Sequence, residues 1–198
     1  MKLMLASRNA HKLRELQTLL EPHELVGLPT AVRLPPETDS TFAGNAVRKA
    51  LAAAKRTGAP TIADDSGIEA AALSGAPGVR SARFAGESAS DEDNLAKLLR
   101  EVPADGDRRV AYVCALAFAD PSGPDVATKL FEARCEGTLA AVPRGAGGFG
   151  YDPAFVPLDT DGERTMAELG ASEKAAISHR GRAARRLLAW LDSERAAA

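Results

Sequence analysis

The first twenty residues place a short apolar run before an amphipathic segment, and this order limits the fold more than any other feature. Residues 2–6 (KLMLA) have the length and apolar character of a buried strand. Leucines recur at helical spacing over residues 10–20, Asn9 can cap the start of that helix, and Pro22 follows its end. A strand joined to a helix by a short polar turn is typical of α/β proteins, so we expect an α/β fold.

Further helices are predicted by their start and stop signals. One begins after Thr41 and ends at Gly58, a glycine in the position that commonly closes a helix. Another begins after Ser90, which is followed by three acidic residues. The last helix has an apolar face, and the Ala-rich tail after Glu194 is expected to be disordered. The residues of that face are Leu187, Leu188, Trp190 and Leu191.

The remaining segments predict strands and loops. Strands are expected over residues 61–63, 109–119 and 128–137, and the turn sequence DPSGPD between the last two predicts an antiparallel hairpin. The Gly- and Pro-rich residues 74–87 predict an irregular loop, and residues 144–153 a glycine-rich one.

The composition excludes several classes of protein. The chain of 198 residues is 45% hydrophobic and 26% charged, which fits one globular domain over residues 1–198. Its net charge of −2 gives no bulk attraction to nucleic acid or to an anionic membrane. No apolar run could span a bilayer, and the start MKLMLASRNAHK turns polar too early for a signal peptide. Cys114 and Cys135 are too few and too distant for a disulfide framework. We expect a cytoplasmic protein without a nucleic-acid or membrane partner.

Two adjacent carboxylates, Asp64 and Asp65, follow the predicted strand 61–63, where we expect a turn. Unpaired charge at the edge of a core is costly, because each ion loses hydration. Glu37 lies in a Pro-stiffened polar segment, and the three carboxylates could converge on Mg²⁺, which takes oxygen ligands. The alternative is an acidic loop beside a helix.

Two segments carry polar and cationic residues that could contact an anion. In SRNAHK, residues 7–12, the free N–H groups of a helix start and the charge of Lys12 favour an anion, although a Walker motif is absent. The alternative is a capped helix with solvated basic residues. Asn45 and Lys49 lie four residues apart on one helical face and could reach a phosphate, but Lys49 could equally be a surface lysine.

The last two polar clusters are GGFGYDP, residues 147–153, and SHRG, residues 178–181. Glycines let a backbone approach a ligand, and an aromatic ring can stack on a base. His179 and Arg180 are donors for phosphate or carbonyl oxygens. Each cluster alone could be a turn or a helix junction. Together with the acids they supply what a nucleoside triphosphate with Mg²⁺ requires.

Five segments in order resemble the inosine triphosphate pyrophosphatase family, also called XTP/dITP diphosphatases. They cover nearly the whole chain: LASRNAHKLREL, ETDSTFAGNAVRKA, IADDSGIEAAALSGAPGVRSARFAG, GGFGYDPAF and AELGASEKAAISHRG. The resemblance implies a long mixed β-sheet flanked by helices, forming two lobes with a nucleotide-binding cleft between them. It also implies a homodimer that hydrolyses deaminated purine nucleoside triphosphates, with Mg²⁺, to the monophosphate and pyrophosphate, so cleansing the nucleotide pool.

The resemblance assigns roles to individual residues. Asp65 resembles the general base, and Glu37 with Asp65 resembles the Mg²⁺ site, with Asp64 a candidate further ligand. We expect Arg180 to donate to the 6-carbonyl of the base, a contact that an adenine amine could not accept. The expected substrate contacts are Ser7, Arg8, Asn9, Ala10, His11, Lys12, Lys49, Ser66, Phe149, Gly150, Tyr151, Asp152, Lys174, His179 and Arg180.

Two positions depart from this family's pattern, and two other functions stay open. Members usually carry Gly where this chain has Asp39 and often Glu where it has Gly44, which bears on metal affinity rather than on the reaction. A Maf-type nucleotide pyrophosphatase would share the opening strand and helix, but its S-x-R-R start differs from SRNAHK. A non-catalytic nucleotide- or RNA-binding module would need a broad basic face, which the balanced charge does not supply.

Overall fold

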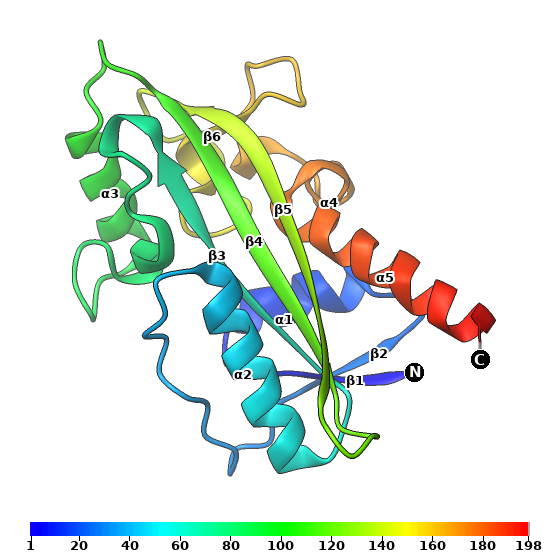
Figure 1. Ribbon diagram of the computed structural model, residues 1–198. Coiled ribbons are helices and arrows are strands. Elements are labelled where there is room, and N and C mark those ends of the chain that lie inside the picture. The colour runs from blue at the N-terminus through cyan, green and yellow to red at the C-terminus, as the bar shows by residue number, and fades with distance from the viewer. Residues whose placement is uncertain (198) are drawn as a thin grey trace. The chain divides into compact units, whose positions relative to one another are not determined.

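The computed structural model describes residues 1–197 and contains a six-stranded mixed sheet with flanking helices (Figure 1). The strand order is β2-β1-β3-β4-β5-β6; β1 is parallel to both β2 and β3, and β5 is antiparallel to β6. This confirms the expected α/β fold. The strands are β1 (Lys2–Leu5), β2 (Glu24–Gly27), β3 (Thr61–Ala70), β4 (Arg109–Asp120), β5 (Ala127–Leu139) and β6 (Phe155–Pro157). The α-helices are α1 (Ala10–Leu19), α2 (Phe42–Thr57), α3 (Asp91–Glu101), α4 (Ala171–Ile177) and α5 (His179–Ala197).

Three of the helices begin where local capping signals predicted. The Asn9 side chain accepts from two backbone N–H groups at the start of α1, and Thr41 accepts from the third residue of α2. Ser90 and Asp93 form a reciprocal capping box at α3. Gly58 closes α2 in the left-handed conformation, with φ of 64°.

The strand predicted over residues 61–63 was too short. β3 continues to Ala70, so Asp64 and Asp65 lie within a strand and not in a turn. The sheet explains the difference, because β3 lies between β1 and β4 and its backbone pairs with both. The loop predicted over residues 74–87 was also partly wrong, since residues Gly78–Arg83 form 3₁₀ turns.

The predicted hairpin corresponds to β4 and β5, which run as long neighbouring strands (Figure 1). Residues 121–126 join them, a connection too short for a parallel crossover, so the pair is antiparallel.

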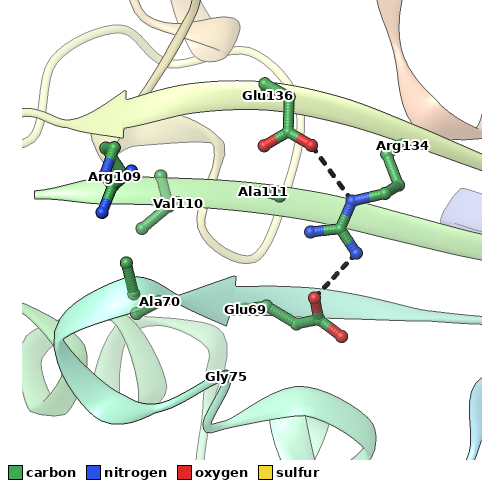
Figure 2. A pocket seen from close by; sticks show the side chains of 9 residues that line it. Glu69, Ala70, Gly75, Arg109, Val110, Ala111, Arg134 and Glu136 are labelled. Atoms are coloured by element: carbon green, nitrogen blue, oxygen red, sulfur yellow. Dashed lines mark hydrogen bonds and ion pairs between the residues drawn. The ribbon is translucent and has the colours of Figure 1, made fainter.

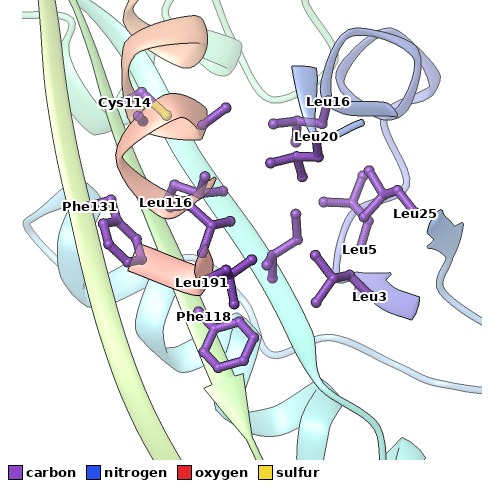
Figure 3. Close-up of a cluster of buried hydrophobic side chains, with 14 of the residues drawn as sticks. Leu3, Leu5, Leu16, Leu20, Leu25, Cys114, Leu116, Phe118, Phe131 and Leu191 are labelled. Atoms are coloured by element: carbon purple, nitrogen blue, oxygen red, sulfur yellow. The ribbon is translucent and has the colours of Figure 1, made fainter. Parts of the chain in front are cut away.

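The chain forms two compact units, each assembled from separate segments. Unit 1 comprises Met1–Asp65, Cys114–Ala133 and Arg180–Ala198, and unit 2 comprises Ser66–Val113 and Arg134–His179. Unit 1 is organised around a buried leucine-rich cluster (Figure 3), and unit 2 has a core of its own. The largest members of the first are Leu3, Leu5, Leu16, Leu20, Ile62, Leu116, Phe118, Phe131 and Leu187; those of the second include Ile68, Leu98, Tyr112, Tyr151, Phe155 and Met166.

Helix α5 supplies the C-terminal apolar face that the sequence predicted. Leu187 and Leu191 are buried, and Leu188 and Trp190 pack against the same core. The helix continues to Ala197, and residue 198 lies outside the described residues, so disorder at the end of the chain stays a prediction there. Across residues 1–197, no helix has both the length and the apolar character needed to cross a membrane.

Candidate active site

Asp64 is a buried carboxylate on β3 that faces two cations within unit 1. Its Oδ2 lies 3.0 Å from Lys12 Nζ and 3.3 Å from Arg180 Nη2. Arg180 also pairs through Nη1 with Glu15 on α1. Burial alone would raise the pKa of Asp64, but the charges of Lys12 and Arg180 outweigh it and hold that pKa below its usual range. Asp64 therefore acts as an ionised counter-charge that holds both cations.

Asp65 is the next residue of β3, so its side chain leaves the opposite face of the strand. There it meets α2: Asn45 Nδ2 donates to Asp65 Oδ2 at 2.9 Å, and Lys49 Nζ lies 3.8 Å from Asp65 Oδ1. Burial raises the pKa of Asp65 above its usual value, even though the charge of Lys49 opposes the shift. Two neighbouring aspartates thus occupy different electrostatic environments.

Lys49 is buried, so it is not an ordinary surface lysine. Its side chain is 8% exposed, and Nζ pairs with the Glu37 carboxylate and donates to the Asp64 carbonyl at 2.8 Å. Burial alone would lower the pKa of Lys49, but the charges of Asp64, Asp65 and Glu37 raise it. The lysine is therefore a permanent cation beside Asp65.

Glu37 and Asp65 are the two acidic residues that could hold a metal ion together with a bound substrate. Both carboxylates lie near one cationic atom, Lys49 Nζ. Within residues 1–197 no three His, Cys, Asp or Glu side chains form a group that could hold a metal alone. Mg²⁺ is commonly held by one or two carboxylates together with substrate phosphates. Asp64 does not join this pair, because its side chain leaves the other face of β3 and binds Lys12 and Arg180.

The predicted phosphate-binding turn is well ordered by its own side chains. Asn9 Oδ1 accepts from the N–H groups of His11 and Lys12, and Ser7 Oγ accepts from Asn9 N. Ala10 and His11 are exposed, and the His11 ring contacts Arg14 at 3.0 Å. From this turn, Lys12 Nζ reaches Asp64 Oδ2.

Arg8 joins the turn to another part of unit 1. Its guanidinium donates to four backbone carbonyls of the segment after β2, at 2.8–3.2 Å. These contacts tie the turn to that segment. The four carbonyls belong to Leu28, Pro29, Thr30 and Val32.

A second group of predicted residues meets at Asp152 in unit 2. The Asp152 carboxylate accepts from Phe149 N at 2.9 Å, from Tyr112 Oη at 3.0 Å and from Lys174 Nζ at 2.7 Å. Lys174 Nζ also lies 5.2 Å from the centroid of the Phe149 ring. His179 stacks on Tyr112, with ring centroids 4.6 Å apart. Phe149, Asp152, Lys174 and His179 are therefore held together by direct contacts.

Tyr151, Gly150 and Ser66 have different surroundings. Tyr151 is 5% exposed within the unit 2 core, and its hydroxyl donates to the Ser81 carbonyl at 2.7 Å. Tyr151 is thus buried in the core, whereas the Phe149 ring is only partly buried. Gly150 N donates to Asp91 at 2.8 Å, and Ser66 is partly buried on β3.

Comparison with known proteins decides the family. The Ham1 family matches residues 3–190. The chain belongs to the Ham1 family. It is 47% identical to the dITP/XTP pyrophosphatase of Streptomyces coelicolor, over 94% of this chain and 95% of the relative. It is 48% identical to the dITP/XTP pyrophosphatase of Geobacillus kaustophilus, over 94% of this chain and 92% of the relative. The solved structure of the Staphylococcus aureus Ham1 protein matches with a TM-score of 0.85 and 40% identity, covering 98% of this chain and all of the other.

Asp39 and Gly44, the two positions expected to depart from the Ham1 family pattern, lie against each other. A Cβ at Gly44 would lie 2.2–2.4 Å from three carboxylate atoms of Asp39. That carboxylate accepts from the Thr41 N–H at 3.1 Å and from its hydroxyl at 2.9 Å, and lies 3.5 Å from Arg48 Nη2. The glycine is therefore needed here because Asp39 occupies the space of a side chain.

Three residues that contact these groups were not predicted from the sequence of this Ham1 family member. Glu15 lies three residues after Lys12, on the same face of α1, and this spacing could have revealed it. Tyr112 and Ser81 carry no such signal, since each contacts residues distant in the sequence.

A cavity of about 260 Å³ in unit 2 contains none of the predicted Ham1 site residues. Figure 2 shows Arg134 on its wall, with its guanidinium 2.8 Å from Glu69 and 3.0 Å from Glu136. These charges satisfy one another, so the cavity carries no functional assignment.

Proposed function

We propose that this protein hydrolyses deaminated purine nucleoside triphosphates, namely XTP, dITP and ITP, to the monophosphate and pyrophosphate. The names of the Streptomyces coelicolor and Geobacillus kaustophilus relatives support this substrate class. The observation that carries the proposal is the environment of Asp65. It is a buried carboxylate of raised pKa, held by Asn45 and faced by Lys49 and Glu37.

Asp65 is proposed as the general base. It accepts a proton from a water molecule, whose oxygen attacks the α-phosphorus in line. The bond between that phosphorus and the oxygen bridging to the β-phosphate breaks, and pyrophosphate leaves with the electron pair. A carboxylate with a raised pKa is the better proton acceptor, because base strength increases with pKa.

Lys12 and Lys49 are proposed to neutralise the triphosphate. Asp64 holds Lys12 before substrate arrives, so little reorganisation is needed when the phosphates bind. The turn from Ser7 to Lys12 adds the positive end of the α1 dipole. Arg8, Asn9, Ala10 and His11 would then contribute through the backbone and shape of this turn.

Mg²⁺ is proposed as the cofactor, with Glu37 and Asp65 as its protein ligands. When bound it would neutralise phosphate charge and polarise the attacking water. The two carboxylates lie near the same lysine, Lys49, and Mg²⁺ prefers oxygen ligands.

The residues around Asp152 are proposed to bind the nucleoside. The Phe149 ring would stack on the base, while Lys174, His179 and the backbone of Gly150 would supply donors, with Ser66 and Tyr151 lining the same region. Arg180 is proposed to donate to the 6-carbonyl. Its pairing with Asp64 and Glu15 means that base reading requires one of these contacts to yield.

We propose that the protein is a homodimer, as the family resemblance implies, and that it is cytoplasmic, as its composition indicates. Size-exclusion chromatography with light scattering would test the dimer.

A substrate panel tests the central proposal. Pyrophosphate release from ITP, XTP and dITP, well above that from ATP and GTP in the presence of Mg²⁺, is the expected result. Preferred turnover of pyrimidine nucleotides would favour the Maf-type activity. Binding of ITP without turnover would favour a non-catalytic module.

A further inference from the structure

Asn45 is a buried amide on the first turns of α2, and its side chain contacts both Asp39 and Asp65. It is 1% exposed, so its polar atoms must be satisfied within the protein. Its Oδ1 accepts from Asp39 N at 3.0 Å, and its Nδ2 donates to Asp65 Oδ2 at 2.9 Å and, more weakly, to the Asp39 carbonyl at 3.4 Å. The amide thus bridges the segment before α2 and a carboxylate on β3.

These contacts determine the orientation of the amide. A backbone N–H can only donate, so the atom of Asn45 that faces Asp39 N must be the oxygen. The NH₂ group is then directed at Asp65. A flipped amide would place two acceptors against each other at Asp65 and two donors against each other at Asp39. The orientation of the side chain is therefore set by the backbone of residue 39.

The Asp39 side chain makes its own, separate contacts at the same turn. The Asp39 carboxylate caps the turn by accepting from Thr41 N and Oγ1, and it fills the space above Gly44. A Cβ at residue 44 would displace it. Asp39 and Gly44 therefore pack together at the start of α2 through the Asp39 side chain, whereas Asn45 uses only the backbone of Asp39 and donates to Asp65.

We propose that Asn45 is a positioning residue that holds the Asp65 carboxylate in the orientation needed for proton abstraction. This inference rests on the proposed function of Asp65. By donating to Oδ2, Asn45 fixes the rotation of the carboxylate and leaves Oδ1 on the side of Lys49. Small misplacements of a catalytic group reduce turnover strongly, because the barrier depends on alignment with the reacting atom.

The test uses Asn45→Ala with Asp39→Ala as its matched control. Asn45→Ala removes the donor to Asp65. Asp39→Ala disturbs the same turn but keeps the backbone N–H and carbonyl that bind Asn45. We expect Asn45→Ala to lower kcat for ITP by roughly ten- to a hundredfold with little change in KM. Asp39→Ala should keep kcat within about twofold at saturating Mg²⁺, because the contact to Asp65 survives.

Crystal structures of both variants provide the second readout, which does not depend on turnover. Asp65 should rotate in Asn45→Ala and keep its orientation in Asp39→Ala. An unmoved Asp65 in Asn45→Ala would overturn the positioning role, whatever the kinetics. Equal kcat losses in both variants would also overturn it, since a general disturbance of the turn would then explain them. A wild-type protein that releases no pyrophosphate from any nucleotide would refute the proposed function alone, and the crystal structures would still decide the role of Asn45.

Discussion

Asp64 and Asp65 are adjacent in β3, yet their carboxylates leave opposite faces of the strand and their pKa values are displaced in opposite directions. Asp64 meets Lys12 and Arg180, whereas Asp65 meets Asn45 and Lys49. The alternation of a strand is what separates them. One aspartate can then remain an ionised anchor while its neighbour is available to accept a proton.

Asp65→Asn should abolish most of the activity while leaving binding intact. The amide has the shape of the carboxylate but cannot accept the proton, so we expect kcat for ITP to fall by roughly a hundredfold or more. Calorimetric titration with a non-hydrolysable ITP analogue should still detect binding. Near-normal turnover in this variant would remove Asp65 from the role of base.

Asp64→Asn should instead reduce stability. Removing one partner from a buried ion pair leaves the cations uncompensated, and we expect a loss on the order of 3 kcal/mol in the free energy of unfolding at neutral pH. Urea denaturation of the variant and the wild type measures this difference. Asp107→Asn, which removes an exposed carboxylate paired with Arg109, is the control and should leave the midpoint unchanged.

The stabilisation by Asp64 should depend on pH in a defined direction. Its folded pKa lies below the unfolded value, so the stabilisation is complete above about pH 4 and is lost as the pH falls through the folded pKa. The difference between wild type and Asp64→Asn should therefore be constant from neutral pH down to about pH 5 and shrink in stronger acid. A stability difference between the two proteins that shrinks with rising pH would contradict an ionised Asp64 paired with Lys12 and Arg180.

Arg180→Ala tests whether this arginine reads the base. We expect kcat/KM to fall more for ITP and XTP than for ATP, because a guanidinium suits a 6-carbonyl and leaves an amine unsatisfied. Arg180→Lys is the matched variant, since it keeps a positive charge beside Asp64 without the planar set of donors. Equal proportional losses for ITP, XTP, GTP and ATP would assign Arg180 to the phosphates or to the fold.

The cysteines should be unreactive in the native protein. Both are buried, and burial raises the pKa of Cys114 to about 12, so almost no thiolate forms at mildly alkaline pH. Mass spectrometry after iodoacetamide treatment should find neither Cys114 nor Cys135 modified in buffer and both modified in concentrated guanidinium chloride. Rapid native alkylation of Cys114 would contradict its buried environment.

Much of the local structure could be predicted because its signals are local. Asn9, Thr41 and Ser90 cap the helices that they were expected to cap, and Gly58 ends α2, since each acts on backbone groups a few residues away. The prediction at residues 61–63 failed because the extent of a strand depends on its neighbours. β3 pairs with β1 at Thr61 and Ile62 and with β4 on its other side, and it continues through the two charged residues to Ala70.

The sequence by itself determined the α/β class, the family and the residue types of the candidate site, because these follow from order, periodicity and motif. Tertiary structure decided what each residue contacts. Lys12, Arg180 and Asp64 are brought together from three distant parts of the chain, and their mutual attraction offsets the hydration that each loses on burial. The same holds for Lys49, whose burial follows only from the acids that surround it. These ion pairs cannot be predicted from sequence spacing, since they depend on which segments fold against one another.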